Sequence, residues 1–226
     1  MKNFWGYIKN DTFAVGCTGQ TVYVYDDKGN EIKKFKDITY GYTPMFCPRK
    51  SMFIVKSTEG MLAVYSLETM TLIKKFRVAK IGVGAQDDGF CFSGDGAFLY
   101  NIERPVSTLH TCLSIYETSG FKRIKQLFLD DNAPGLSLVE YDFDRNCPCV
   151  LGYLPGEYYF VARLQDDKLT DITELAGEKY VVIRDFKKLE LQGFTAKSKE
   201  WSGLNFRGFD LSDAETLTVR LSDYIR

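Results

Sequence analysis

Val22-Tyr-Val-Tyr-Asp-Asp-Lys-Gly-Asn-Glu-Ile-Lys-Lys-Phe35 places an apolar run, a polar turn and a basic run in direct succession. The same order recurs at residues 62–76 and 113–127, and in fainter form at 159–172 and 204–221. A recurring phrase of this kind indicates an internal repeat, in which each copy forms one supersecondary unit.

The spacing of the copies sets the size of the repeat. The residues that end the apolar runs are separated by 40, 51, 46 and 47 residues. This is close to the roughly 40–50 residues of a four-stranded propeller repeat, so five units fit the chain. The five positions are Tyr25, Tyr65, Tyr116, Ala162 and Phe209.

Two more short apolar stretches precede each phrase, such as Pro44–Cys47 and Met52–Val55 in the second unit. Each unit therefore holds four short strands with tight turns, the pattern of an antiparallel meander. The chain is expected to be one domain of five such units. Their approximate bounds are 1–37, 40–78, 86–130, 135–175 and 178–226.

The third strand of each unit is expected to be covered on both faces. Val22 and Val24 point one way while Tyr23 and Tyr25 point the other, and a strand exposed on one side would alternate with polar residues. The fourth strand carries pairs such as Lys33-Lys34 and is expected at the outer edge, where lysines discourage pairing with other molecules. Radially stacked sheets satisfy both requirements.

A known repeat family has a similar sequence pattern. The stretch Phe92-Ser-Gly-Asp-Gly-Ala-Phe-Leu-Tyr100, followed by Leu113-Ser-Ile-Tyr116, resembles the F-S-x-D-G core and aromatic-ended strand of WD40 repeats. The chain has neither the Trp-Asp dipeptide nor the Gly-His pair of that family. The resemblance implies an all-β protein, a β-propeller of about five four-stranded blades.

The last segment fits two structures. Leu217, Val219 and Leu221 alternate with polar residues as in a strand. Ser212-Asp-Ala-Glu215, followed by Leu217, Leu221 and Ile225, also fits a capping box and a helical stripe. The register of the repeat favours the strand for residues 212–226.

Composition restricts the possible partners and compartment. Of 226 residues, 45% are hydrophobic and 26% charged, and 29 Lys+Arg against 30 Asp+Glu give a net charge of −1. No nucleic acid or membrane partner is expected, because there is no overall basic field and no long apolar segment. The N-terminus lacks a signal-peptide core, so a cytoplasmic protein is expected. The six cysteines lie in apolar stretches and are predicted to be buried thiols.

Metal and redox motifs are incomplete. Asp142-Phe-Asp-Arg-Asn146 begins like a calcium loop, but Cys147 stands where the loop needs Gly, so a turn between strands is expected instead. Cys147-Pro-Cys149 lacks the spacing and the second pair of a zinc site, so two small buried side chains on one strand face are predicted. No metal and no cofactor are expected.

No catalytic residue is assigned. His110 is the only histidine and lies in the long insertion 103–111, but the chain has no recognisable nucleophile motif. Acidic residues near the predicted blade ends leave a glycosidase open, since its two acids would lie roughly 5–10 Å apart across the substrate. These residues are Asp87, Asp88, Asp95, Glu103, Asp130, Asp131, Glu140 and Asp142.

Two functions follow. The leading hypothesis is a non-enzymatic interaction module that binds a protein or peptide on one propeller face. The alternative is a carbohydrate-active enzyme or small-ligand binder that uses acidic residues at the central channel. For the first, we expect binding residues in loops 37–43, 103–111 and 196–203, of types enriched at interfaces. They are Tyr40, Tyr42, Arg104, His110 and Trp201.

Overall fold

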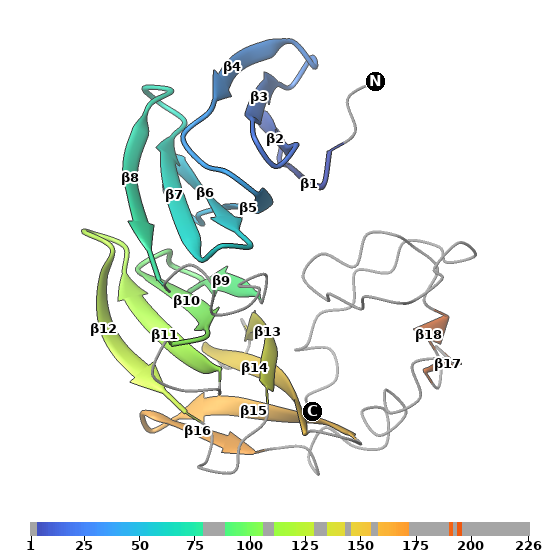
Figure 1. The fold of residues 1–226 in the computed structure, drawn as a ribbon, viewed down its shortest axis with the longest axis vertical. Helices are drawn as coiled ribbons and strands as arrows, with labels where there is room; N and C mark the ends of the chain where they lie inside the picture. The colour runs from blue at the N-terminus through green and yellow to red at the C-terminus, as the bar shows by residue number, and fades with distance from the viewer. Residues whose placement is uncertain are drawn as a thin grey trace. The chain divides into compact units, whose positions relative to one another are not determined.

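The computed structural model describes residues 4–78, 89–105, 111–128, 135–142, 146–154, 158–171, 190–191 and 194–195. The regular structure among them is β-strand, mostly in antiparallel four-stranded sheets (Figure 1). Within these ranges there is no helix with the length and hydropathy needed to cross a membrane. The predicted all-β fold class is confirmed.

The chain divides into two compact units. The first contains Met1–Asp87 together with Glu103–Leu109, and the second contains Asp88–Ile102 together with His110–Arg226. The first unit holds two of the four-stranded sheets, which carry most of the residues discussed below.

The first sheet consists of consecutive strands paired in chain order, with turns closed by side chains. In the turn before the second strand, the Asn10 Oδ1 accepts the N–H groups of Thr12 and Phe13, at 3.0 and 2.8 Å. Such bonds let Asn replace a backbone acceptor within a turn. The strands are β1 (Gly6–Lys9), β2 (Phe13–Cys17), β3 (Val22–Asp26) and β4 (Glu31–Phe35).

The second sheet has the same order and a more buried centre. Every residue of its second strand is buried, and Leu62 to Tyr65 in its third strand are fully buried, as expected for strands covered on both faces. In β3 only the valines are buried, whereas Tyr23 and Tyr25 are half-buried. The strands are β5 (Gly41–Phe46), β6 (Met52–Ser57), β7 (Met61–Ser66) and β8 (Leu72–Arg77).

An apolar core joins these two sheets. The Phe35 ring lies 4.4 Å from the Tyr65 ring, and Tyr65 stacks on Phe53 at 5.0 Å, all between ring centroids. Ile38, in the connection between the sheets, is buried in the same cluster as Val15 from β2. The apolar side chain of Ile38 therefore anchors the connection after β4 to the core.

A β-bulge recurs at one place in three sheets. Val24 pairs with Lys33 but Tyr25 pairs with Glu31, so Ile32 is the extra residue of β4. The same shift makes Ile73 the extra residue of β8. In the second unit it makes Ile124 the extra residue of the strand Lys122–Leu127. A bulge adds local twist and interrupts the ladder of an edge strand.

The second unit contains two further four-stranded sheets. The first is β9 (Phe90–Phe92), β10 (Phe98–Glu103), β11 (Cys112–Glu117) and β12 (Lys122–Leu127). The next is β13 (Gly135–Asp142), β14 (Cys147–Leu154), β15 (Tyr158–Gln165) and β16 (Lys168–Asp171). The short strands β17 (Glu190–Leu191) and β18 (Phe194–Thr195) also pair, while residues 212–226 lie outside the described residues.

The Phe92-Ser-Gly-Asp-Gly segment forms the turn between β9 and β10. The Ser93 Oγ donates to the Asp95 Oδ1 at 2.6 Å and accepts the N–H of Phe98 at 2.9 Å. The Thr118 Oγ1 donates to the carbonyl of Gly96 at 2.6 Å, and Gly96 has a positive φ of 70°. The segment thus has a defined role, since its polar side chains complete the bonds of a tight turn.

Candidate interaction site

An exposed tryptophan precedes the first strand. The backbone N–H of Trp5 donates to the carbonyl of Cys17 at 2.8 Å, which fixes the main chain beside β2. The indole stacks on the Tyr42 ring, with 4.6 Å between centroids and 12° between planes. Even so, 57% of Trp5 is exposed, so a large aromatic group is held in place and still open to solvent.

Tyr42 meets Trp5 because of a second kind of bulge. The sequence predicted a loop through residue 43, but β5 begins at Gly41, where the Gly41 N–H donates to the carbonyl of Gly19 at 2.9 Å. Gly41 pairs with Ser57 while Thr43 pairs with Lys56, so Tyr42 is the extra residue. A bulge re-aims a side chain in this way without ending the strand.

Two glycines permit the close approach of Trp5 and Tyr42. A Cβ on Gly6 would lie only 1.6 Å from the carbonyl oxygen of Tyr42. A Cβ on Gly19 would lie 2.3 Å from the indole of Trp5, and Gly19 has a φ of +84°. Only glycine fits both positions, because a methyl group would displace either the strand or the ring.

Tyr40 lies just before β5 in a strained conformation. Its φ is 52°, in the left-handed region that bulky residues rarely adopt, and 49% of the residue is exposed. The Tyr40 carbonyl accepts the N–H of Thr58 at 3.1 Å, which ties this connection to the β6–β7 turn. An exposed aromatic residue kept in a strained backbone conformation is a feature found at functional sites.

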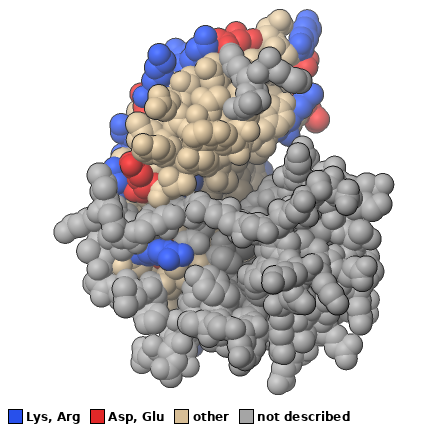
Figure 2. All heavy atoms as spheres, turned by 45° about the vertical axis from the view of Figure 1, so that its right-hand side comes forward, with Lys and Arg blue, Asp and Glu red and all other residues tan. Residues whose placement is uncertain are grey.

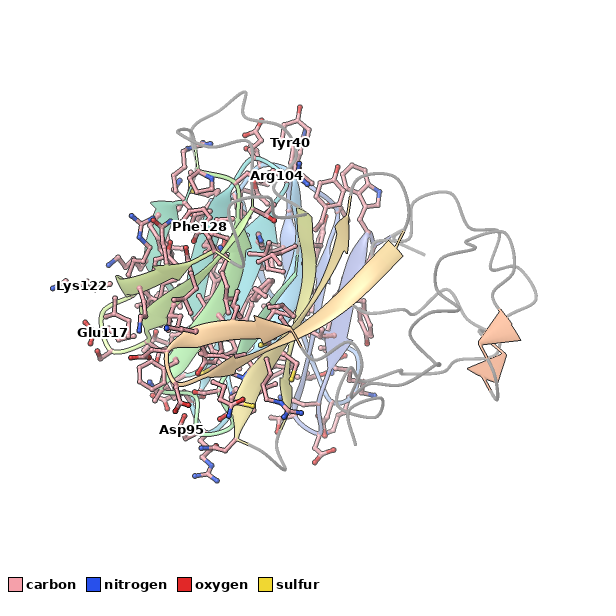
Figure 3. The ribbon with its side chains drawn as sticks, turned by 90° about the horizontal axis from the view of Figure 1, so that it is seen from below. Tyr40, Asp95, Arg104, Glu117, Lys122 and Phe128 are labelled. Carbon is pink, nitrogen blue, oxygen red and sulfur yellow. The ribbon has the colours of Figure 1, made fainter. Side chains whose placement is uncertain are left out.

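Arg104 follows β10 and belongs to the same compact unit as Tyr40. It is half-buried, and Figure 3 shows both labelled residues toward the same end of the ribbon. His110 and Trp201, the other two predicted binding residues, lie outside the described residues. The structure therefore brings Tyr42 against Trp5, with Tyr40 two residues away in the chain.

Trp5 is not among the binding residues predicted from the sequence. A usable indication was present, since Trp5 directly precedes a glycine at the start of the first unit. Trp5, Tyr40 and Tyr42 together are called the Trp5 site below. It presents aromatic surface and tyrosine hydroxyl groups, the chemistry of side chains that anchor interfaces.

Two buried polar groups in the core of the first unit, the Cys17 thiol and the Tyr65 hydroxyl, do not favour ionisation. Burial raises the pKa of the Cys17 thiol to about 12. Burial, with a contribution from Asp37, also raises the pKa of the Tyr65 hydroxyl, which has no hydrogen-bond partner. Both groups are therefore neutral at physiological pH.

The other predicted chemistry falls in the fourth sheet. Asp142 at the end of β13 pairs with Cys147 at the start of β14, and the Tyr141 hydroxyl donates a hydrogen bond of 2.6 Å to the Asn146 Oδ1. The intervening residues 143–145 lie outside the described residues. Cys149 is buried and Cys147 is half-buried. The pKa of Cys149 is raised, first by its hydrogen bond to Cys147 and then by burial. The described residues contain no group of three His, Cys, Asp or Glu side chains placed to hold a metal.

Comparison with known proteins supports the fold. No family model and no curated protein sequence matches the chain. A match among solved structures is the WD40 domain of coronin from Toxoplasma gondii, with a TM-score of 0.58 and 12% identity. The match covers 76% of this chain and 45% of that chain, so this chain spans less than half the length of the matched structure.

The consecutive four-stranded sheets and this structural match define the class of fold. The chain is a WD40-like β-propeller protein, as the resemblance of residues 92–116 predicted. Because one fold hosts many functions, the function has to be argued from a site.

Proposed function

We propose that this protein is a non-enzymatic interaction module that binds a protein or peptide at the Trp5 site. The observation that carries the proposal is the stacked pair of Trp5 and Tyr42, which leaves more than half of the tryptophan exposed. Trp and Tyr are enriched among the residues that dominate binding energy, because they bury a large area at a small cost in conformational entropy.

The geometry supports binding by a preformed surface. The indole is fixed on one side by Tyr42 and approached by Gly19, and its backbone is bonded to β2. A partner would not have to order this side chain, and less of the interaction free energy would be lost on binding. Arg104 from the same unit could add a charged contact at the margin.

The alternative, a carbohydrate-active enzyme or small-ligand binder at the channel, rests on acidic residues alone. Among these, Glu103 is buried and Asp95 is occupied in the turn between β9 and β10. Asp87, Asp88, Asp130 and Asp131 lie outside the described residues. Nothing observed at the described acidic residues favours catalysis, and the interaction module is the function we propose.

The test uses peptides selected against the wild-type protein from a random library displayed on phage. Their dissociation constants are then measured by fluorescence anisotropy for wild type, Trp5→Ala and Phe98→Ala. Phe98 is a matched control, since it is an exposed aromatic residue on a strand of the second unit. We expect Trp5→Ala to weaken binding by about tenfold or more, as for a hot-spot residue, and Phe98→Ala to change it less than twofold.

Circular dichroism would establish that both variants remain folded. Peptides that bind wild type and folded Trp5→Ala equally well would contradict the proposed site. A selection that yields no binding peptide would count against the proposed function itself.

A further inference from the structure

The repeated basic runs found in the sequence contain an element that the Trp5 site does not use. The runs in β4, β8 and β12 place an isoleucine directly before a lysine, as Ile32-Lys33, Ile73-Lys74 and Ile124-Lys125. Each isoleucine is the bulged residue of its strand. The exposed fractions of the three residues are 43%, 53% and 52%.

The structure gives this isoleucine and the apolar residue three positions later different environments. Phe35, three residues after Ile32, is buried on Tyr65 and holds β4 to the core. The corresponding Phe76 is half-buried, and Lys74 lies over its ring at 5.8 Å. The isoleucines contribute little to the core, because about half of each remains in solvent.

Protection of the edge strands explains the lysines and the bulges but not the exposed isoleucines. Lysines and bulges both discourage a second chain from pairing with an exposed strand. An exposed isoleucine has the opposite effect, since it adds apolar surface where pairing is to be avoided. Thr would supply the same β-branched shape and preference for strands without that surface.

The outer strands also concentrate positive charge. β4, β8 and β12 together carry eight Lys or Arg and one Glu, in a chain whose net charge is −1. Lys and Arg side chains gather along the margin of the upper part of Figure 2, and Lys122 extends away from its sheet in Figure 3. The ion pairs Lys34–Glu31 and Lys125–Asp167, both 2.8 Å, lie at the surface, where such pairs contribute little.

We propose that β4 and β8, the outer strands of the two sheets in the first unit, form a second interaction surface, which binds an acidic polypeptide segment that carries aliphatic side chains. Lys75 of β8 donates a hydrogen bond of 2.9 Å to the carbonyl of Asp37, just after β4, so the two strands lie near each other. Carboxylates of the segment would pair with the lysines, and its aliphatic groups would cover the isoleucines. This surface, the outer-strand surface, is separate from the Trp5 site and does not depend on it.

The chemistry of the surface distinguishes this partner from other polyanions. Nucleic-acid bases bind by stacking on aromatic rings, and isoleucine offers none. A lipid surface requires a continuous apolar face that inserts below the headgroups, whereas here each strand offers one β-branched side chain between cations. A polypeptide can place an acidic and an aliphatic residue beside each strand separately.

The experiment uses a fluorescein-labelled peptide of four Glu-Asp-Leu-Ser repeats and a matched peptide in which every Leu is Ser. Fluorescence anisotropy is measured with wild type and with the double variant Ile32→Thr, Ile73→Thr. We expect the Leu peptide to bind wild type at least tenfold more tightly than the Ser peptide. The double variant should lose most of this difference, because the transfer of each aliphatic group from water would be lost.

A second variant tests the charges without touching the isoleucines. Lys33→Gln with Lys74→Gln should weaken binding of the Leu peptide and reduce its dependence on salt concentration. Thermal unfolding should show that both double variants are folded, since the altered side chains are exposed.

Three results would overturn the proposal: no binding of the Leu peptide, equal binding of both peptides, or equal binding by the Ile→Thr variant. Binding to vesicles of phosphatidylserine and phosphatidylcholine without binding to the peptide would instead assign the surface to lipid. Because Trp5→Ala leaves these strands intact, it should not change binding of the Leu peptide, which keeps this test distinct from that of the Trp5 site.

Discussion

At the scale of single residues, the backbone of Tyr40 stores strain next to the proposed binding surface. A bulky residue held at a φ of 52° costs about 1–3 kcal/mol of backbone strain, which the surrounding structure has to sustain. Its backbone is held by the bond from Thr58 and by the buried Ile38 two residues earlier. Under the proposed function, the strained backbone would present the tyrosine ring to the partner.

Tyr40→Asn should increase the stability of the protein and weaken the binding of peptides selected at the Trp5 site. Asn adopts the left-handed region with little strain, so we expect a gain of about 1 kcal/mol in the free energy of unfolding. Thermal unfolding and anisotropy measure the two effects. Arg49→Asn is the matched control, because Arg49 is exposed with a φ of 58°.

Arg49→Asn should give a similar gain in stability with unchanged binding. A loss of stability in Tyr40→Asn would contradict the strain at this position, and unchanged binding would remove Tyr40 from the site.

Gly6 sets the distance between the first strand and Tyr42. Gly6→Ala would place a methyl group against the Tyr42 carbonyl oxygen, so we expect a destabilisation of about 2 kcal/mol or more from overpacking. Gly120→Ala is the control, since a Cβ there would meet nothing within 4 Å. Chemical denaturation of the two variants measures the difference, and equal stability would contradict the close contact.

At the scale of elements, the turn that connects β3 to β4 is held by hydrogen bonds to one carboxylate. The Asp26 Oδ1 accepts the N–H of Asn30 at 2.7 Å and that of Lys28 at 3.0 Å, and its Oδ2 accepts the Asn30 side chain. These bonds, the side-chain bond from Asn30 first, hold the pKa of Asp26 below its ordinary value of 3.8. The carboxylate thus supports the turn only while it is ionised.

Asp26→Ala should lower the melting temperature at pH 7 and have less effect in acid. The folded-state pKa of Asp26 is depressed, so its stabilisation is complete above about pH 4 and is lost as the pH falls through the folded value. Melting temperatures of wild type and variant at pH 7 and pH 2.5 test this, with Asp27→Ala as the control. A difference between wild type and Asp26→Ala that is the same at both pH values would contradict this role.

The bulges change the direction in which particular side chains point, and amino-acid composition does not predict this. In β4, β8 and β12 the same register shift turns an isoleucine outward, and in β5 a shift turns Tyr42 toward Trp5. One feature, an extra residue in a strand, therefore supplies a side chain to both proposed surfaces. The outer strand β16 (Lys-Leu-Thr-Asp) lacks the isoleucine and lysine pair, so this pattern is confined to the first three sheets described.

At the scale of the whole molecule, much of the fold could be predicted because the same sequence pattern occurs several times. A copy whose secondary structure is ambiguous can then be interpreted from the clearer copies. The phrase at residues 22–35 recurs with the same order of apolar and basic runs. The copies at residues 22–35, 62–76, 113–127 and 159–171 lie in the third and fourth strands of their sheets, while the copy at 204–221 lies outside the described residues. The all-β class and the WD40-like fold are confirmed on this basis. The blade bounds, the cytoplasmic location and the absence of nucleic acid and membrane partners stay predictions.

The site was less predictable, because it depends on register and on a contact between strands distant in sequence. Tyr42 was predicted as a binding residue because tyrosine is enriched at interfaces. The sequence of residues 37–43 does not predict the bulge that turns its side chain toward Trp5. Trp5 precedes the first strand, and its ring lies close to Gly19 and Tyr42, which are distant from it in sequence. Such information lies in pairs of segments rather than in one segment.

The backbone bond from Gly41 to Gly19 has a consequence for the kinetics of recognition. It joins the connection that carries Tyr40 to the segment of Gly19, which lies beside the Trp5 ring, so the two parts of the Trp5 site are linked through the backbone. A partner would meet this surface already assembled, and no slow rearrangement would limit its capture. Association should then proceed at the about 10⁵–10⁷ M⁻¹s⁻¹ typical of preformed surfaces, and differences in affinity among partners should reside in how long each complex lasts.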